Sequence, residues 1–171
     1  DDDGDADYED DGQMGQFSLC AVCEEYDLNS VRHDATDRSI TFAVDSAACR
    51  TVVPLKHRAA RGYRVHKDKS FGCNYGTAKK NGPKIKDEGL RILQTKVAGG
   101  NPPQRLKTRK ADVQRPLMAV CDMVDCGHAV LFDSGGSYAV NKTIGKLTPF
   151  VRKGKGWDLT LEIDAPEHAN Q

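Results

Sequence analysis

The chain has 171 residues, with 25 Lys and Arg, 25 Asp and Glu, and a formal net charge of zero. That length suits one domain with a sizeable core plus tails. No stretch reaches the roughly 20 apolar residues of a membrane-spanning helix, and the N-terminus lacks the basic and apolar regions of a secretory signal, so we expect an intracellular protein without a membrane partner.

The charge is unevenly distributed along the chain. Residues 1–12 carry eight acids and no base, which leaves 25 bases and 17 acids for the other 159 residues. Such an acidic run repels itself and has little to bury. We therefore expect a disordered acidic tail at 1–16, a folded domain at 17–163 and a short C-terminal tail at 164–171.

Short runs of β-branched and aromatic residues, separated by Gly, Pro, Asn and Asp, predict many short strands. In chain order the expected strands are 17–22, 39–44, 51–55, 63–66, 75–78, 90–97, 106–113, 129–132, 137–140, 147–151 and 157–163. The strands at 75–78 and 90–97 are expected to form a hairpin with a turn at Asn81-Gly82. A tight turn is expected at 133–136.

One segment predicts a helix. Pro116 suits a first helical position, and Leu117, Val120, Cys121 and Val124 then share one apolar face at helical spacing. Gly127 is expected to end this helix, because Gly is common just after the last helical turn. Many short strands with one short helix predict an all-β domain, either a closed barrel or a sandwich.

The segment ITFAVDSAACRTVVP places an acid, Asp45, at the end of an apolar strand, in a turn of small residues. Burying a carboxylate is costly unless hydrogen bonds satisfy it. An Asp that only caps its own turn is the simplest explanation, because Asp is common in turns. The alternative is a reactive carboxylate presented by that turn.

The surrounding residues favour the reactive carboxylate. FAVDSAACRTVVP resembles the D-[ST]-G-A motif of aspartic proteases. The later stretches YGTAKKNGPKIKDEGLRILQTK and DVQRPLMAVCDMVDCGHAVLFDSGGSYAVNK resemble the hairpin and the closing block of one branch of that group. Together, over about residues 39–163, the chain resembles the retropepsin-like protease domain of copia-type retrotransposon polyproteins.

The resemblance implies a closed retropepsin-like β-barrel, equivalent to one lobe of an acid protease, that works as a homodimer. Each chain would contribute one catalytic carboxylate, Asp45. Ser46, Ala47 and Ala48 would support the active-site loop, with the Ser46 hydroxyl tying the two loops together.

The same resemblance implies a flap over the site. Its residues Tyr75, Gly76, Thr77 and Ala78 would bind an extended peptide or polyprotein substrate. The mechanism needs no cofactor and no metal.

One residue departs from the motif, because Ala47 stands where the family has Gly. Gly tolerates backbone angles that Ala does not, and a positive φ at Ala47 would cost on the order of 1 kcal/mol or more. Two possibilities therefore stay open: an active aspartic endopeptidase, or a weakened or inactive protease-like module that binds peptides or dimerises.

Other signals in the sequence have simpler interpretations. Cys20-x2-Cys23 has metal-ligand spacing, but without a matching second pair all six cysteines are expected to be reduced thiols. The basic stretches 79–86, 105–115 and 152–155 are expected to be solvated faces, and nucleic-acid binding by this domain is not expected because aromatic residues are sparse among them. Asp133-Ser134-Gly135 matches D-S-G, but it is expected to be a hairpin turn.

Overall fold

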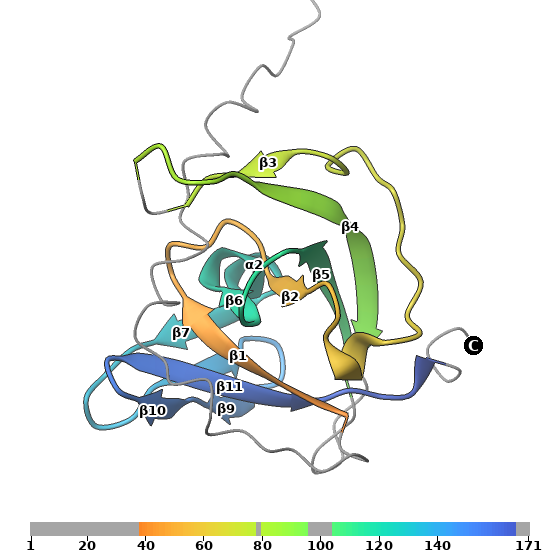
Figure 1. Cartoon of the computed structure of the whole chain (residues 1–171). Helices are drawn as coiled ribbons and strands as arrows, with labels where there is room; N and C mark the ends of the chain where they lie inside the picture. Colours follow the sequence, from red (N-terminus) through yellow and green to blue (C-terminus); the bar gives the residue numbers. More distant parts are fainter. Residues whose placement is uncertain (1–37, 78–79, 96–103, 167–171) are drawn as a thin grey trace, which may run out of the picture.

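The computed structural model describes residues 38–77, 80–95 and 104–166, which form a β-rich domain with one short α-helix (Figure 1). The tail 1–16 and the strand expected at 17–22 lie outside the described residues. The elements are β1 (Ser39–Asp45), β2 (Val52–Pro54), the 3-10 helix η1 (Arg58–Ala60), β3 (Asn74–Tyr75), β4 (Ile85–Gln94), β5 (Arg105–Ala111), β6 (Leu117–Ala119), α2 (Val120–Asp125), β7 (His128–Leu131), β8 (Tyr138–Asn141), β9 (Leu147–Pro149), β10 (Val151–Lys153) and β11 (Gly156–Glu162).

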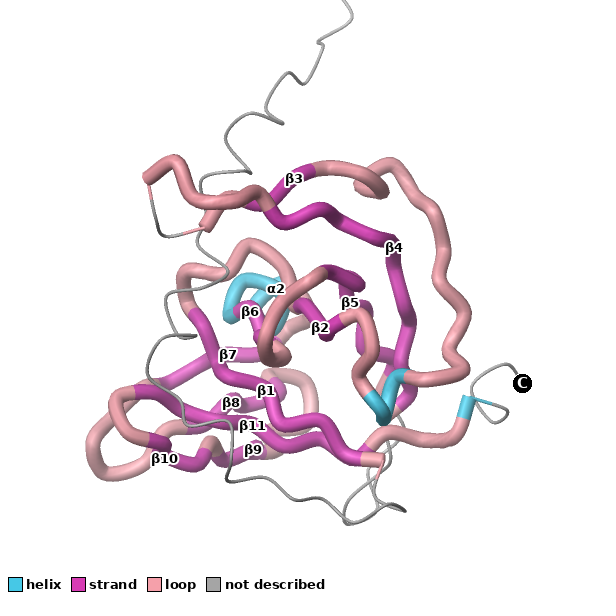
Figure 2. Tube along the Cα trace, viewed as in Figure 1, coloured by secondary structure: helices cyan, strands magenta, loops and turns pink. Residues whose placement is uncertain are grey.

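The larger sheet has the strand order β10-β11-β1-β6-β2-β5-β4-β3, and a smaller sheet has the order β7-β8-β9. Two pairs in the larger sheet are parallel, β1 with β6 and β2 with β5. Strand β6 lies between β1 and β2, so it joins the two parts of the sheet in space (Figure 2). Its register sets Asp45 opposite Ala119, immediately before α2 begins.

The central position of β1 and β6 follows from their apolar sequences. All three residues of β6 are buried, and so are six of the seven residues of β1. A strand that is covered on both faces carries a continuous apolar run rather than an alternating pattern. By contrast, β4 alternates between buried and partly exposed positions along most of its length, which is typical of a strand with one solvated face.

The prediction of an all-β domain with one short helix is confirmed. The sheet does not close into a continuous barrel within the described residues, because β10 and β3 are its two ends. One isolated bridge, between Thr95 and Ile163, connects the end of β4 to the end of β11.

The helix was predicted to begin too early. Residues 117–119 form strand β6, and the helix starts only at Val120. The predicted apolar face is wrong as well, because Val124 is 46% exposed whereas Met123 is buried. Strand pairing with β1 and β2 overrides the helical spacing of these residues, since it buries Leu117 completely.

Other boundaries also differ from the prediction. Residues 63–66 form a single bridge at His66 rather than a strand, and the strand expected at 147–151 is interrupted at Phe150. Phe150 is buried, with its ring 6.1 Å from that of Phe132, and Phe132 in turn lies 4.9 Å from Trp157. This aromatic cluster joins the smaller sheet to the β10–β11 hairpin.

A hairpin does begin at the predicted first arm, but its second arm was predicted too late, because Tyr75 lies opposite Ile85 and residues 90–94 pair with β5 instead. Asn81 has a φ of 65°, the left-handed conformation that Asn accepts more readily than most residues at a turn. Strand β3 is shorter than expected and ends at Tyr75. The described residues contain no helix that is long and apolar enough to cross a membrane.

Candidate active site

Asp45 is the last residue of β1 and only 6% of its surface is exposed. Its Oδ1 accepts a hydrogen bond of 2.8 Å from the Ala47 N–H. Its Oδ2 is buried and has no hydrogen-bond partner among the described residues. Burial raises the pKa of the Asp45 carboxyl, while the Ala47 and Ala48 amides act in the opposite direction.

The three loop residues after Asp45 occupy different environments. Ser46 and Ala47 are exposed, whereas Ala48 is buried in an apolar cluster. Among the described residues Asn81 is the only non-glycine with a positive φ. The backbone strain considered for Ala47 is therefore absent, and its methyl group lies on the surface of the chain.

The loop is held in place by Thr51, which is buried at its far end. The Thr51 Oγ1 accepts a hydrogen bond from the buried Ala119 N–H at 3.1 Å and lies 3.5 Å from the Met118 sulfur. The Thr51 N–H donates to Asp122 Oδ2 at 2.7 Å, in the first turn of α2. These bonds attach the end of the loop to both β6 and α2.

Helix α2 also contacts the middle of the loop. The Cys121 thiol lies 3.5 Å from the carbonyl oxygens of both Ala48 and Cys49. Thr51, Asp122 and Cys121 were not identified from the sequence, because their role depends on β6 placing α2 beside the Asp45 loop.

The D-S-G triplet at Asp133 has the same local hydrogen bond as the Asp45 turn. Asp133 Oδ2 accepts from the Gly135 N–H at 2.8 Å, and the Gly136 N–H donates to the Asp133 carbonyl. Asp133 is exposed, however, and it connects β7 to β8. This agrees with the predicted hairpin turn, and burial rather than the turn itself distinguishes Asp45.

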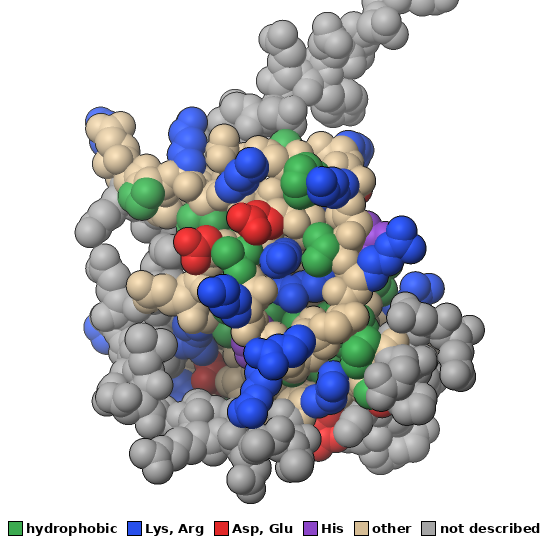
Figure 3. All heavy atoms as spheres, turned by 45° about the vertical axis from the view of Figure 1, so that its right-hand side comes forward, with side chains coloured by type: hydrophobic (Ala, Val, Ile, Leu, Met, Phe, Trp, Pro, Cys, Tyr) green, Lys and Arg blue, Asp and Glu red, His purple; other side chains and the backbone are tan. Residues whose placement is uncertain are grey.

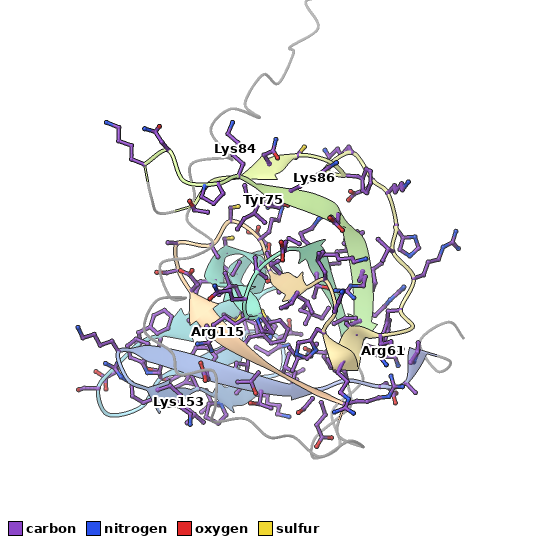
Figure 4. All side chains as sticks on the ribbon, in the orientation of Figure 1. Arg61, Tyr75, Lys84, Lys86, Arg115 and Lys153 are labelled. Carbon is purple, nitrogen blue, oxygen red and sulfur yellow. The ribbon has the colours of Figure 1, made fainter. Side chains whose placement is uncertain are left out.

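The predicted flap residues lie on the β3–β4 hairpin and just after β3. Tyr75 is only 3% exposed and belongs to the same apolar cluster as Ala48 (Figure 4). Gly76 and Thr77 are partly exposed, and Ala78 lies outside the described residues. Tyr75 therefore packs the base of the hairpin against the Asp45 loop, and Gly76 and Thr77 are the described flap residues with access to a ligand.

A buried ionic network supports the hairpin. Asp87 on β4 is fully buried, and both its oxygens accept bonds from Arg109 on β5, at 2.7 and 2.8 Å. Tyr75 donates its hydroxyl to Asp87, and Gly89 donates its amide. Asp68 completes the network with two bonds from Arg109 at 2.7 and 2.8 Å.

The network shifts the pKa values of three of its members. Burial and the hydrogen bond to Asp87 raise the pKa of Tyr75, and the bonds from Arg109 lower the pKa of Asp68. Burial alone would lower the pKa of Arg109, but the two carboxylates raise it. An ionic network in which the carboxylates and the guanidinium are all hydrogen-bonded positions the hairpin rather than performing chemistry.

The part of the chain that the structure describes contains no group of three or more His, Cys, Asp or Glu arranged to hold a metal ion. Cys20 and Cys23 lie outside the described residues. Cys49, Cys73, Cys121 and Cys126 are free thiols. Comparisons with protein-family models, with curated proteins and with solved structures find no significant match.

Proposed function

We propose that the chain is an aspartic endopeptidase that works as a homodimer, with one Asp45 from each copy. The observation that carries the proposal is the buried Asp45 carboxylate, which has one oxygen oriented by its own loop and the other without a partner among the described residues. We propose that this unpaired oxygen shares a proton or a water with a second acid when the Asp45 loops of two copies meet. The sequence resemblance to retropepsin-like proteases implies that this second acid is Asp45 of another copy.

In the proposed dimer the two carboxylates hold one proton between them, because two adjacent negative charges are unfavourable. The ionised carboxylate accepts a proton from water as it attacks the scissile carbonyl. The protonated carboxylate donates a hydrogen bond to that carbonyl oxygen, and a proton then passes to the leaving amine. Burial at Asp45 already favours the protonated form within one chain.

Two neighbouring features support this chemistry. The exposed Ser46 hydroxyl has no hydrogen-bond partner among the described residues and is available to a second loop. The β3–β4 hairpin packs on the Asp45 loop through Tyr75 and leaves Gly76 and Thr77 partly exposed. We propose that these residues contact the backbone of an extended peptide, in the manner of an added strand.

The test is cleavage of a mixture of unstructured peptides by the full chain at about pH 4, below the upper pKa of about 4.7 of such a dyad, where it holds one proton. Asp45→Asn should abolish cleavage. The matched control is Asp133→Asn, which removes the acid from the D-S-G triplet of the β7–β8 turn and should leave the rate unchanged. Cleavage that survives Asp45→Asn would refute the proposal.

A second variant addresses the departure from the motif. Ala47 has no backbone strain and its methyl is exposed, so Ala47→Gly tests only whether the methyl crowds a second loop. An equal rate in Ala47→Gly and the parent means that the parent is fully active. Cleavage only after Ala47→Gly means that the natural chain is an inactive protease-like module that binds peptides or dimerises.

A further inference from the structure

A second functional surface lies away from Asp45, on the segment between β2 and β3. Residues 55–72 contain six bases and one acid. We call residues 55–72 the basic segment. Its six bases are all exposed: Lys56, Arg58, Arg61, Arg64, Lys67 and Lys69. No carboxylate of the described residues lies within ion-pair distance of any of them.

The one acid in this stretch does not neutralise the surface. Asp68 binds Arg109 with both oxygens, and Arg109 is also paired with the buried Asp87. Figure 3 brings this side of the molecule forward and shows Lys and Arg side chains spread over the face, with few Asp and Glu among them. In Figure 4, Arg61 lies toward the lower end of this side and Lys86 toward its upper end.

The basic segment is held against the body at three positions. Tyr63 donates its hydroxyl to the Asp164 carbonyl at 2.8 Å. His66 exchanges two backbone bonds with Leu90, at 2.8 and 2.9 Å. The Gly72 N–H donates to the Asp87 carbonyl at 2.9 Å. Arg64, Lys67 and Lys69 lie between these anchors and are exposed, so these cations are presented on a fixed backbone.

A buried cation lies beneath the start of the segment. Arg91 on β4 is 3% exposed and donates to the Pro54 carbonyl at 3.1 Å and the Ala60 carbonyl at 3.5 Å. No carboxylate of the described residues pairs with it. Burial lowers the pKa of Arg91, but a guanidinium keeps its charge in proteins. Its charge adds to the positive potential of the surface above it.

We infer that the basic segment binds the phosphate backbone of single-stranded nucleic acid. A row of exposed cations of one sign on a fixed backbone fits a polymer with one charge per phosphate, and arginine forms paired hydrogen bonds with phosphate. An exposed aromatic ring completes the surface, because Phe71 is 38% exposed with the Lys67 ammonium 4.9 Å from its ring centre. Base stacking on such a ring is typical of single-strand binding.

This surface was not recognised from the sequence because its bases are separated by one or two other residues and form no run. It is also independent of the proposed protease activity, since none of its residues touches the Asp45 loop through a described hydrogen bond. Nucleic-acid binding had not been expected for this domain on the basis of its basic runs alone.

The test is fluorescence anisotropy of the full chain with a labelled single-stranded RNA of about 20 nucleotides, at about 50 and about 200 mM salt. The test variant is Arg61→Gln with Arg64→Gln and Lys67→Gln. The control removes the same charge from the exposed turns of the two C-terminal hairpins, as Lys142→Gln with Lys146→Gln and Lys155→Gln.

Loss of three phosphate contacts should lower the slope of log affinity against log salt by about 2, and weaken binding at least about tenfold at the lower salt. The control should bind like the parent, and Phe71→Ala should weaken binding about fivefold or more. Asp45→Asn should bind like the parent, so failure of the protease proposal would leave this result intact.

Absence of RNA binding by the parent, or equal weakening in the control, would overturn the inference. A competing arm uses a synthetic peptide of residues 1–12, which carries eight acids. Tighter binding of this peptide than of RNA would also overturn the inference, because the surface would then serve an acidic protein segment.

Discussion

Replacing Thr51 by Val should destabilise the fold and disturb the Asp45 loop. The change keeps the size and the β-branching of the side chain, and it removes only the hydroxyl that accepts the buried Ala119 N–H at 3.1 Å. A buried donor left without a partner costs about 1–3 kcal/mol. We therefore expect the free energy of unfolding to fall by about 2 kcal/mol, measured by urea denaturation of the full chain at one protein concentration.

The matched control is Thr41→Val on the same sheet. Thr41 also loses a hydroxyl contact, its 2.8 Å bond to Thr160, but that pair is exposed and its loss should change stability by no more than about 0.5 kcal/mol. Thr51→Val should also slow peptide cleavage, since a shift of about 1 Å in a catalytic group can cost roughly a hundredfold. Equal unfolding free energies for the two variants would refute the bracing role of Thr51.

Gly89→Ala should lower the free energy of unfolding by more than about 1 kcal/mol, because Gly89 has a φ of 116° and an added Cβ would lie 2.9 Å from the His66 carbonyl oxygen. Thermal denaturation measures this loss of stability. An unchanged melting temperature would contradict the prediction. Asp68→Asn should flatten the acid limb of the stability curve. The carboxyl pKa is lowered by Arg109 in the folded chain, so its contribution is present above the unfolded value of 3.8 and disappears as pH falls through the lower folded pKa; an unchanged acid limb would show that the pair contributes nothing. The Cys49 thiol should react with iodoacetamide more slowly at neutral pH in the folded chain than in urea, because burial raises its pKa; peptide mass spectrometry checks this, and equal rates would contradict it.

The turn at each acid could be predicted from the sequence, but the burial of the acid could not. Asp45 and Asp133 both accept a 2.8 Å bond from the amide two residues later, as expected for Asp in a turn. Only one of the two strands leading to them is central in a sheet. Strand β1 is covered on both faces and buries Asp45, whereas β7 leads to an exposed turn.

The start of the helix is a second feature that local sequence patterns did not predict correctly. Apolar residues at helical spacing predicted a helix from Pro116, but residues 117–119 pair with β1 and β2 instead. Strand pairing depends on residues more than 60 positions away along the chain, such as Val52 opposite Leu117. A local periodicity cannot report such a partner, because tertiary burial outweighs intrinsic propensity.

The sequence by itself determined the all-β class, the order of most strands, the turn at Asn81, and the choice of Asp45 as the candidate acid. These features depend on short-range patterns of apolar, turn and acidic residues. Only the tertiary structure decided that Thr51 and α2 brace the Asp45 loop, that Tyr75 is buried against that loop, and that dispersed bases form one surface. Each of these depends on contacts between segments distant in the chain, and such contacts leave no local signal.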